Sequence, residues 1–320
     1  MAELSYDFKV NSARSYLRTK GFLHYGSQLV PNKIESETWS LVWAYIRRVD
    51  DLIDNPALSY EQRMKILLEE SMVIEDSLNN RFEATPDKPI RHIWLNQFLV
   101  NEDRYYNGKA RPIIRELYRS ALMDVNRIGK LISRREMDLL LYRKAVNFFR
   151  LYFTLARFDM GRYLDDIAYN LGKALGSLDD VLDFQTDYES GYINVPKEDA
   201  EKLGITPTDK NIIDKLIGSE YLERKAKEIM GYLIKARKLA FRISNTIVRW
   251  LVLRLTESFA YPILKGNFVP GGKYFFRGGK LLLSILPRDE GLAYKIGNKL
   301  MRIALLIPQI NLSLFNSWIG

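Results

Sequence analysis

The sequence predicts an all-α fold, and three observations carry this prediction. Apolar residues recur at spacings of three and four through most of the 320 residues, which is typical of amphipathic helices. Turn-forming residues gather at few places, and the long segment 108–170 contains a single proline, Pro112. Alternating apolar and polar runs bounded by turns, which would indicate strands, are scarce. We therefore expect roughly ten helices in a single-domain bundle that spans residues 1–320.

Turn signals mark where the expected helices end. They contain the proline, glycine and asparagine combinations that favour turns. They are Asn55-Pro56, Thr85-Pro86-Asp87, Gly191 to Pro196, Thr206-Pro207, and Pro270-Gly271-Gly272 through Gly278-Gly279. The glycine-rich segment 270–280 lacks both a preceding strand and the ending of a nucleotide-binding P-loop. No internal repeat and no low-complexity tract divides the chain further.

The composition limits the chemistry. The chain has no cysteine and only two histidines, His24 and His92. Disulfides, thiolate zinc sites, iron–sulfur clusters and a cysteine nucleophile are thereby excluded. The ligands of any bound metal must be mostly carboxylates, and oxygen ligands favour a hard cation such as Mg²⁺.

The basic residues are unevenly distributed. The chain carries 48 basic and 39 acidic residues, and +6 of its +9 formal charge lies after Glu257. A basic balance favours a phosphorylated substrate, an anionic lipid or nucleic acid. The run KYFFRGGK is the only hint of basic and aromatic interleaving, so we expect no nucleic-acid partner.

The last residues are apolar without resembling a membrane span. The segment Ile303–Gly320 is uncharged, but Pro308 and Asn311 interrupt it. We interpret residues 300–320 as a buried C-terminal helix, with a peripheral membrane contact as the alternative. Because the first ten residues lack a basic region followed by an apolar run, we expect a cytoplasmic protein.

The first informative segment is WSLVWAYIRRVDDLID, residues 39–54. An apolar stripe runs along one face of this expected helix: Trp39, Trp43 and Ile46. The same spacing continues to Asp50 and Asp54, so these carboxylates stand on the inward face, one turn apart. Asp51 lies about 100° further round the helix and is a weaker candidate.

The second segment covers residues 166–196 and repeats the pattern. Apolar residues follow one another at four-residue steps: Ile167, Leu171 and Leu175. The same steps then reach Asp179, Asp183 and Asp187. Unpaired buried carboxylates are costly, so two such rows facing each other would be compensated by bridging divalent cations.

Acid pairs on helices are usually solvated surface, and a single cluster would carry little weight. Two clusters that each continue an apolar stripe favour a functional site. Carboxylate-bound Mg²⁺ suits a diphosphate leaving group, because the metal neutralises charge as the carbon–oxygen bond breaks. Arg47 and Arg48 directly precede the first cluster and are expected to bind the diphosphate. Walls rich in Trp, Phe and Tyr would hold a hydrocarbon tail and stabilise a carbocation.

At these residues the sequence resembles the squalene/phytoene synthase family of head-to-head prenyl diphosphate synthases. AYIRRVDDLID is similar to the family's first aspartate-rich motif, and DVLDFQTDYESGYINVP to its second. REMDLLLYRKAVNFFRLYFTLA is similar to the segment between them, and TKGFLHYGSQLVP resembles the family's entry segment more loosely. The resemblance runs through most of residues 15–285.

The resemblance implies an isoprenoid synthase fold with a central cavity, and it assigns the site. The implied ligands of two to three Mg²⁺ ions are Asp50, Asp54, Asp183 and Asp187, with Asp179 assisting. The implied diphosphate-binding residues are Arg47, Arg48 and Lys20. In the implied two-step reaction, one substrate ionises to an allylic cation that the second substrate attacks. A cyclopropyl diphosphate follows and ionises in turn.

The second motif departs from the family's pattern. Leu182 and Tyr192 stand where the family usually has arginine, and Thr186 where it has glutamate. In this interpretation metal binding is retained, but fewer basic residues lie beside the second motif than is usual in the family. Arg157 or the basic residues near the C-terminus are candidates to replace them.

We expect an Mg²⁺-dependent prenyltransferase of isoprenoid or carotenoid biosynthesis. It would condense two farnesyl or geranylgeranyl diphosphates to a squalene- or phytoene-like hydrocarbon. The alternatives are a terpene cyclase or another transferase of the same fold, and a non-catalytic assembly protein. A requirement for NADPH stays open, because squalene formation is reductive in the family, phytoene formation is not, and the sequence has no dinucleotide fingerprint.

Overall fold

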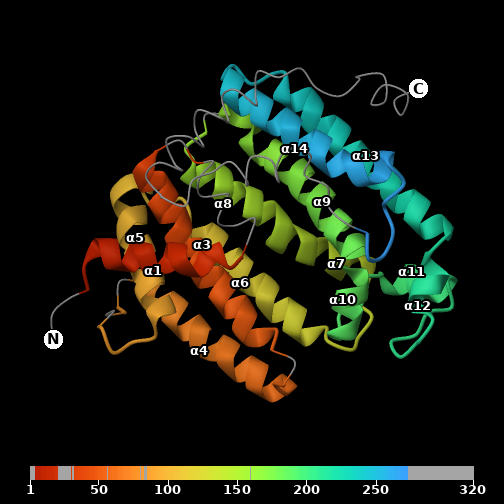
Figure 1. Ribbon diagram of the computed structural model, residues 1–320, viewed down its shortest axis with the longest axis horizontal. Coiled ribbons are helices and arrows are strands. Elements are labelled where there is room, and N and C mark those ends of the chain that lie inside the picture. The colour runs from red at the N-terminus through yellow and green to blue at the C-terminus, as the bar shows by residue number, and fades with distance from the viewer. Residues whose placement is uncertain are drawn as a thin grey trace. The chain divides into compact units, whose positions relative to one another are not determined.

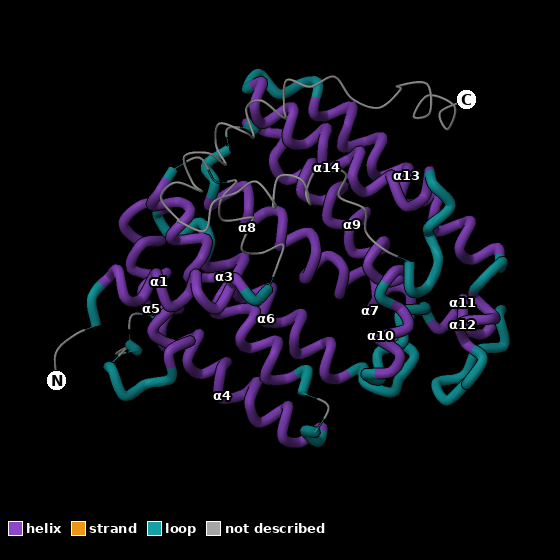
Figure 2. Tube along the Cα trace, in the orientation of Figure 1, coloured by secondary structure: helices purple, strands orange, loops and turns teal. Residues whose placement is uncertain are grey.

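The computed structural model describes residues 4–20, 30, 32–55, 57–79, 81–82, 85–158 and 160–272. Within these ranges the chain forms helices joined by loops and no strand, as Figure 2 shows. The all-α prediction is therefore confirmed. The expected tail 300–320, most of the basic residues after Glu257 and most of the entry segment lie outside the described residues.

The chain divides into two compact units. Unit 1 consists of Met1–Phe158 and Thr186–Lys210, and unit 2 of Asp159–Gln185 and Asn211–Gly320. The expectation of a single domain stays a prediction. The helices that belong wholly to unit 1 (Figure 1) are α1 (Tyr6–Arg18), α3 (Lys33–Ile53), α4 (Tyr60–Leu78), α5 (Ile90–Tyr106), α6 (Arg111–Asn126), α7 (Arg134–Leu141), the π-helix η1 (Tyr142–Val146), α8 (Asn147–Leu155) and α11 (Lys197–Lys202).

Unit 2 contains the second set of helices. They are the 3₁₀-helix η2 (Gly161–Tyr163), α9 (Leu164–Leu182), α12 (Ile212–Leu216), α13 (Glu220–Ala240) and α14 (Thr246–Leu264). The short helix α10 (Phe184–Glu189) begins in unit 2 and ends in unit 1. The described residues hold more helices than the roughly ten expected, because α10, α11 and α12 are single turns of five or six residues.

Local sequence explains where several helices begin. Ser59 and Gln62 form a reciprocal capping box at the start of α4, and Ser133 and Glu136 do the same for α7. Such boxes satisfy backbone N–H groups that the first helical turn leaves without partners. The predicted turn at Gly191 is also present: its φ of +90° favours glycine, and an added Cβ would lie 3.1 Å from the Ile128 side chain.

Helix α3 is the central element of unit 1. It packs against α1, α4, α5 and α8. Trp39 and Trp43, which the sequence places on its inward face, are buried. The Trp39 ring centroid lies 5.0 Å from that of Tyr152, and the Trp43 centroid 4.9 Å from that of Phe148. Edge and tilted aromatic packing of this kind adds to the area buried and fixes α3 against α8.

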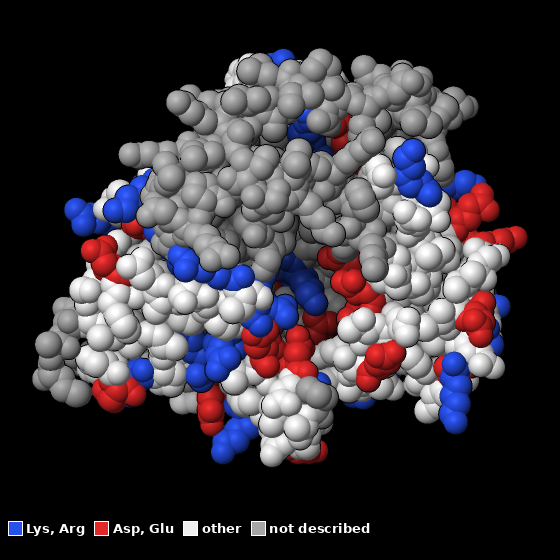
Figure 3. Space-filling view, in the orientation of Figure 1, with Lys and Arg blue, Asp and Glu red and all other residues white. Residues whose placement is uncertain are grey.

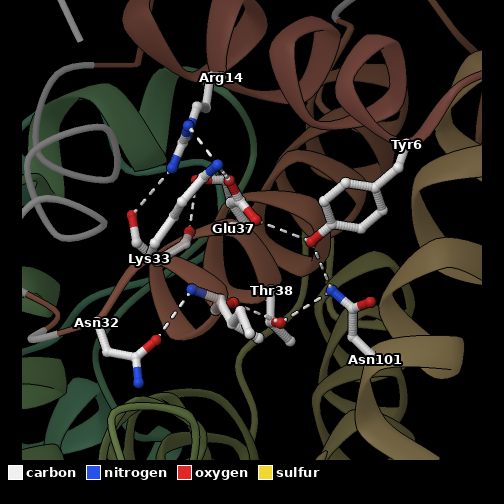
Figure 4. Close-up of polar contacts among 10 residues, drawn as sticks. Tyr6, Arg14, Asn32, Lys33, Glu37, Thr38 and Asn101 are labelled. Atoms are coloured by element: carbon white, nitrogen blue, oxygen red, sulfur yellow. Dashed lines mark hydrogen bonds and ion pairs between the residues drawn. The ribbon is translucent and has the colours of Figure 1, made fainter. Parts of the chain in front are cut away.

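A buried polar network fixes the N-terminal half of α3 (Figure 4). The Tyr6 hydroxyl of α1 donates to Glu37 at 2.9 Å. The Asn101 side-chain amide of α5 donates to Tyr6 at 3.2 Å and to Thr38 at 3.0 Å. Asn32 caps the helix by accepting from the Ile34 N–H at 3.0 Å. Since these bonds join three helices, they fix the position of the start of α3. Because a helix is stiff, they also help to position its other end, which carries Asp50.

In unit 2, α9 packs on α13 and α14, and these two helices pack on each other. The face of α9 that carries Ile167 and Leu171 is buried as the sequence predicts, whereas Leu175 is only half-buried. Pro262 lies inside α14. Proline removes one backbone hydrogen bond from a helix interior.

None of the described helices is long and apolar enough to cross a bilayer. One surface cavity of about 210 Å³ lies between α4 and α6 and is lined by Glu75 and Arg115 among others. Another of about 240 Å³ lies between α9 and α13, beside Asp166 and Lys235. Neither touches the aspartate motifs, so the central cavity stays a prediction.

Candidate active site

The first aspartate pair closes α3. Asp50 lies in the last turn, and Asp54 follows the last helical residue as the C-cap, with its N–H donating to the Asp50 carbonyl at 2.8 Å. The last turn of α3 contains no basic residue. Carboxylates here face the negative end of the helix dipole, which normally favours lysine or arginine. The two charges are therefore placed where a bound cation would stabilise them.

The electrostatics of the pair agree with this placement. Solvent reaches the Asp50 side chain, 37% of which is exposed. Displacement of bulk water by the protein nevertheless raises the Asp50 pKa to about 7, against the attraction of Lys144 and Arg47 and with repulsion from Asp54. The pKa of Asp54 is also raised, chiefly by desolvation. Both carboxyls gain from nearby positive charge.

Asp51 has a different environment, which we call the Asp51 cluster: Tyr16, Lys20, Arg47, Arg48 and Asp51. The Asp51 carboxylate lies 2.5 Å from Lys20 Nζ and 3.1 Å from Arg47 Nε, and it accepts from the Tyr16 hydroxyl at 2.5 Å. Arg48 lies over the Tyr16 ring, 5.9 Å from its centroid. Partial desolvation raises the pKa of Asp51, but the hydrogen bonds from Lys20 and Tyr16 outweigh it and hold this pKa below its usual range.

The Asp51 cluster brings together the three basic residues expected at the diphosphate. Lys20 follows the end of α1, while Arg47 and Arg48 come from α3. Figure 3 shows acidic and basic side chains lying next to one another over the region where Figure 1 places α3 and α4. Asp51 thus positions Lys20 and Arg47, a role that its place on the helix did not indicate.

The second motif closes α9 in the same way that the first closes α3. Asp183 is the C-cap of α9, and its N–H donates to the Asp179 carbonyl at 2.9 Å. The last turn again contains no basic residue. The row drawn from the sequence through Asp187 does not follow one helix, because α9 ends at Leu182 and α10 begins at Phe184. Asp183 is exposed and Asp179 half-buried.

Asp187 belongs to a chain of polar contacts within unit 1, which we call the Asp124 network: Asp187, Asn194, Arg127, Asp124 and Lys144. The Asn194 amide donates to Asp187 at 2.5 Å and accepts from Arg127 Nη1 at 2.9 Å. Arg127 Nε donates to Asp124 at 2.8 Å, and Lys144 Nζ donates to the other Asp124 oxygen at 3.0 Å. Asp124, Arg127 and Asn194 are buried, so the contacts among these three residues are protected from water.

The Asp124 network also places the guanidinium of Arg127 beside Tyr192, the position where the family usually has arginine. The Arg127 guanidinium lies 5.1 Å from the centroid of the Tyr192 ring and donates to the Ile193 carbonyl at 3.3 Å. Arg157, the candidate named from the sequence, instead pairs with Glu35 at 3.7 Å. Glu35 lies in the first turn of α3, about 22 Å along the helix from Asp50.

Sequence reasoning missed Asp124, Arg127, Lys144 and Asn194. The spacing of Asp124 and Arg127 indicates an ordinary pair across one helical turn. Nothing in the sequence places Arg127 beside Asn194, because these two residues are 67 positions apart. Lys144 stands in the π-helix η1, whose wider turn no apolar periodicity revealed.

The donor chemistry fits a hard divalent cation. Carboxylate oxygens are the ligands that Mg²⁺ takes in proteins, and two helix ends present them without a basic neighbour in the last turn. Among the residues that the structure describes, no group of three or more acidic or histidine side chains lies close enough to hold a metal.

The sequence matches the squalene/phytoene synthase family over residues 23–258, a range that includes both aspartate motifs. The chain belongs to this family. Members are prenyltransferases that act on prenyl diphosphates and generally depend on a divalent metal, so the chain is a prenyltransferase. The non-catalytic alternative is set aside. No sequence among the curated proteins matches the chain.

Two solved structures place this family member in the isoprenoid synthase fold. A dehydrosqualene synthase in complex with ligand is 14% identical, with a TM-score of 0.59 over 93% of this chain and 98% of that one. The squalene synthase HpnC from Alicyclobacillus acidocaldarius is 17% identical, with a TM-score of 0.60 over 82% of this chain and 95% of that one. At these identities the likeness establishes the fold alone.

Proposed function

We propose that this prenyltransferase condenses two polyprenyl diphosphates head-to-head in an Mg²⁺-dependent reaction that releases diphosphate. The single observation that carries the proposal is shared by α3 and α9: both helices end in aspartates with no basic residue in the last turn. Carboxylates destabilise a helix at this end, so their presence at both motifs favours a role in binding cations.

The proposed metal ligands are Asp50, Asp54, Asp183 and Asp187, with Asp179 assisting. Bound Mg²⁺ would supply neutralisation of the charge that develops on the diphosphate as its bond to carbon breaks. The raised pKa values of Asp50 and Asp54 support this assignment, because each carboxyl is more stable beside positive charge.

The Asp51 cluster provides the proposed diphosphate contacts. Asp51 orients Lys20 and Arg47, whose side chains remain 26% and 39% exposed and keep N–H donors for a second acceptor. Arg48 is exposed beside them. Pre-oriented donors lose little entropy when the diphosphate arrives, and they favour the state in which its charge is greatest.

The hydrocarbon part of the substrate requires an apolar wall. Trp43 precedes Asp50 by two helical turns, about 10 Å along the axis of α3. It packs on Phe148, which is half-buried. We assign this aromatic surface to the prenyl chain, where the faces of the rings would stabilise an allylic cation and exclude water.

A product assay tests the proposal. The protein is incubated with Mg²⁺ and with farnesyl or geranylgeranyl diphosphate, and released diphosphate and hexane-extractable products are measured. We expect diphosphate release that EDTA abolishes and Mg²⁺ restores, with a C30 or C40 hydrocarbon as product. A parallel assay with NADPH separates reductive from non-reductive condensation.

The outcomes separate the candidate reactions. A single cyclic product would replace condensation by terpene cyclisation, the alternative that the missing arginines at positions 182 and 192 favour. The absence of diphosphate release from both substrates would contradict the proposal.

We further propose a cytoplasmic protein that contacts anionic membranes at their surface. The excess basic charge after Glu257 and the uncharged segment Ile303–Gly320 support this proposal, because positive charge beside apolar residues suits an anionic interface. A C30 or C40 hydrocarbon must also leave the enzyme into lipid.

Co-sedimentation with vesicles tests the membrane contact. The full chain should sediment with vesicles that contain phosphatidylserine, and deletion of residues 300–320 should lower the bound fraction severalfold. Vesicles of phosphatidylcholine alone serve as the control. Equal binding of the full and shortened chains would remove the proposal.

A further inference from the structure

Lys144 is held in an unusual backbone conformation. The π-helix η1 interrupts the run from α7 to α8. Short π-helical turns of this kind occur frequently at functional sites, because the wider turn changes the direction of the side chains it carries. In η1 the result is that Lys144 Nζ lies 3.0 Å from Asp124 of α6. The Lys144 side chain stays 62% exposed, so its ammonium is fixed at one partner and open to another.

The charge of Lys144 also acts on the first aspartate motif. Lys144 is the strongest attractive influence on the carboxyls of both Asp50 and Asp54. Asp124, followed by Asp50 among the attractive charges, raises the pKa of Lys144 in return, so the ammonium stays protonated. The lysine therefore adds a cation from outside α3 to a motif whose own last turn has none.

The partner of Lys144 is itself anchored. Asp124 accepts from the buried Arg127 at 2.8 Å, and Arg127 continues through Asn194 to Asp187. Although desolvation opposes it, the attraction of Lys144 and Arg127 keeps the pKa of Asp124 below its usual range. The Asp124 network thus fixes the position of Lys144 and connects it to Asp187, an aspartate of the second motif.

We propose that Lys144 binds the diphosphate of the substrate beside Asp50 and Asp54, with Asp124 as the positioning residue. Lysine binds phosphate as a compact charge with three donors, and only one donor is engaged by Asp124. Asp50 and Asp54 would hold the cation, and the Lys144 ammonium would then have the diphosphate as its second anionic partner. Lys144 would also offset the arginine that is absent at Tyr192. This inference rests on the proposed function.

Binding of inorganic pyrophosphate provides the first test. Calorimetric titration in Mg²⁺ compares the wild type with Lys144→Met, Lys144→Arg and Asp124→Asn. Lys130→Met is the matched control, because Lys130 is an exposed lysine that donates to the Asn126 carbonyl at 3.0 Å. We expect Lys144→Met to weaken pyrophosphate binding about tenfold or more and to raise KM for the prenyl diphosphate by a similar factor.

The other variants separate binding from folding. Lys144→Arg should recover most of the affinity, Asp124→Asn should fall between, and Lys130→Met should match the wild type. A purely structural ion pair would lower the thermal midpoint without changing pyrophosphate affinity. A folded Lys144→Met with wild-type affinity and KM would overturn the proposal.

A second measurement uses the wild-type protein alone. Lysines are labelled briefly with acetic anhydride, and the extent at each site is read by peptide mass spectrometry. Pyrophosphate with Mg²⁺ should slow labelling of Lys144 several-fold and leave Lys130 unchanged, and equal rates would contradict the proposal. Failure of the wild type to release diphosphate from prenyl substrates would instead contradict the proposed function, because these two measurements do not depend on turnover.

Discussion

Replacing Asp50 and Asp183 together by asparagine should lower the rate of diphosphate release at least about a thousandfold. Asparagine keeps the shape of each side chain and removes the charge that would hold Mg²⁺. Each position closes a helix, α3 in one case and α9 in the other, so one change removes a proposed ligand from each motif. The rate is measured as diphosphate released from farnesyl and geranylgeranyl diphosphate at saturating Mg²⁺.

Stability gives the same experiment an independent readout. Removing a carboxylate from a helix C-terminus relieves repulsion by the dipole, typically about 0.3–1 kcal/mol at each site. The double variant should therefore unfold at the same temperature as the wild type or above it, while activity is lost. A loss of activity together with a lower midpoint would indicate damage to the fold instead.

The pH dependence in EDTA should follow the raised pKa of Asp50. A carboxyl whose pKa is about 7 in the folded protein and near 3.8 in the unfolded chain disfavours folding once it ionises. As the pH rises from about 4 to about 7, the wild type should therefore lose stability relative to Asp50→Asn. Below pH 4 the two should converge, because the carboxyl is then protonated in both states.

The control for the double variant is Asp76→Asn. Asp76 lies on α4, half exposed and paired with Arg81 at 3.3 Å, outside both motifs. It should keep wild-type activity. Diphosphate release by the Asp50 and Asp183 double variant within tenfold of the wild type would contradict the assignment of these residues.

The second large effect is expected at Arg127. Replacement by methionine should destabilise the protein by about 3 kcal/mol. The buried guanidinium bonds to Asp124, Asn194 and a backbone carbonyl, and it stacks on Tyr192. Methionine fills part of the volume but leaves buried polar groups without their donor. Urea unfolding at pH 7 measures the change in the free energy of unfolding.

Arg81→Met provides the comparison. The Arg81 side chain is 66% exposed and pairs with Asp76 at 3.3 Å, so its loss should change the free energy of unfolding by no more than about 1 kcal/mol. Arg127→Lys should fall between, because lysine keeps the charge and loses the planar fork. Equal losses for Arg127→Met and Arg81→Met would contradict the role of the Asp124 network.

The sequence was sufficient for the fold class and for the position of both motifs. Helical periodicity predicted that Trp39 and Trp43 face inward, and both are buried. Proline and glycine predicted turns at Asn55-Pro56 and at Gly191, and α3 ends at Ile53, two residues before Asn55, while Gly191 has a positive φ. These features depend on residues within a few positions of one another, which a linear pattern records.

The aspartates of the second motif show where helical periodicity no longer predicts the structure. Asp179, Asp183 and Asp187 are four residues apart in the sequence, but the helix ends at Asp183. Asp187 consequently bonds to Asn194 in unit 1. Periodicity assumes one continuous helix. It cannot detect a break in the helix where no proline or glycine marks it.

The sequence by itself determined an all-α prenyltransferase of the squalene/phytoene synthase family with aspartates at the ends of two helices. Only the tertiary structure decided which lysines from other elements pair with Asp51 and Asp124. Lys20, beyond the end of α1, pairs with Asp51, and Lys144 of η1 pairs with Asp124. The physical reason is that periodicity is a property of one helix, whereas an ion pair between helices depends on how they pack and on the register that a π-helical turn sets.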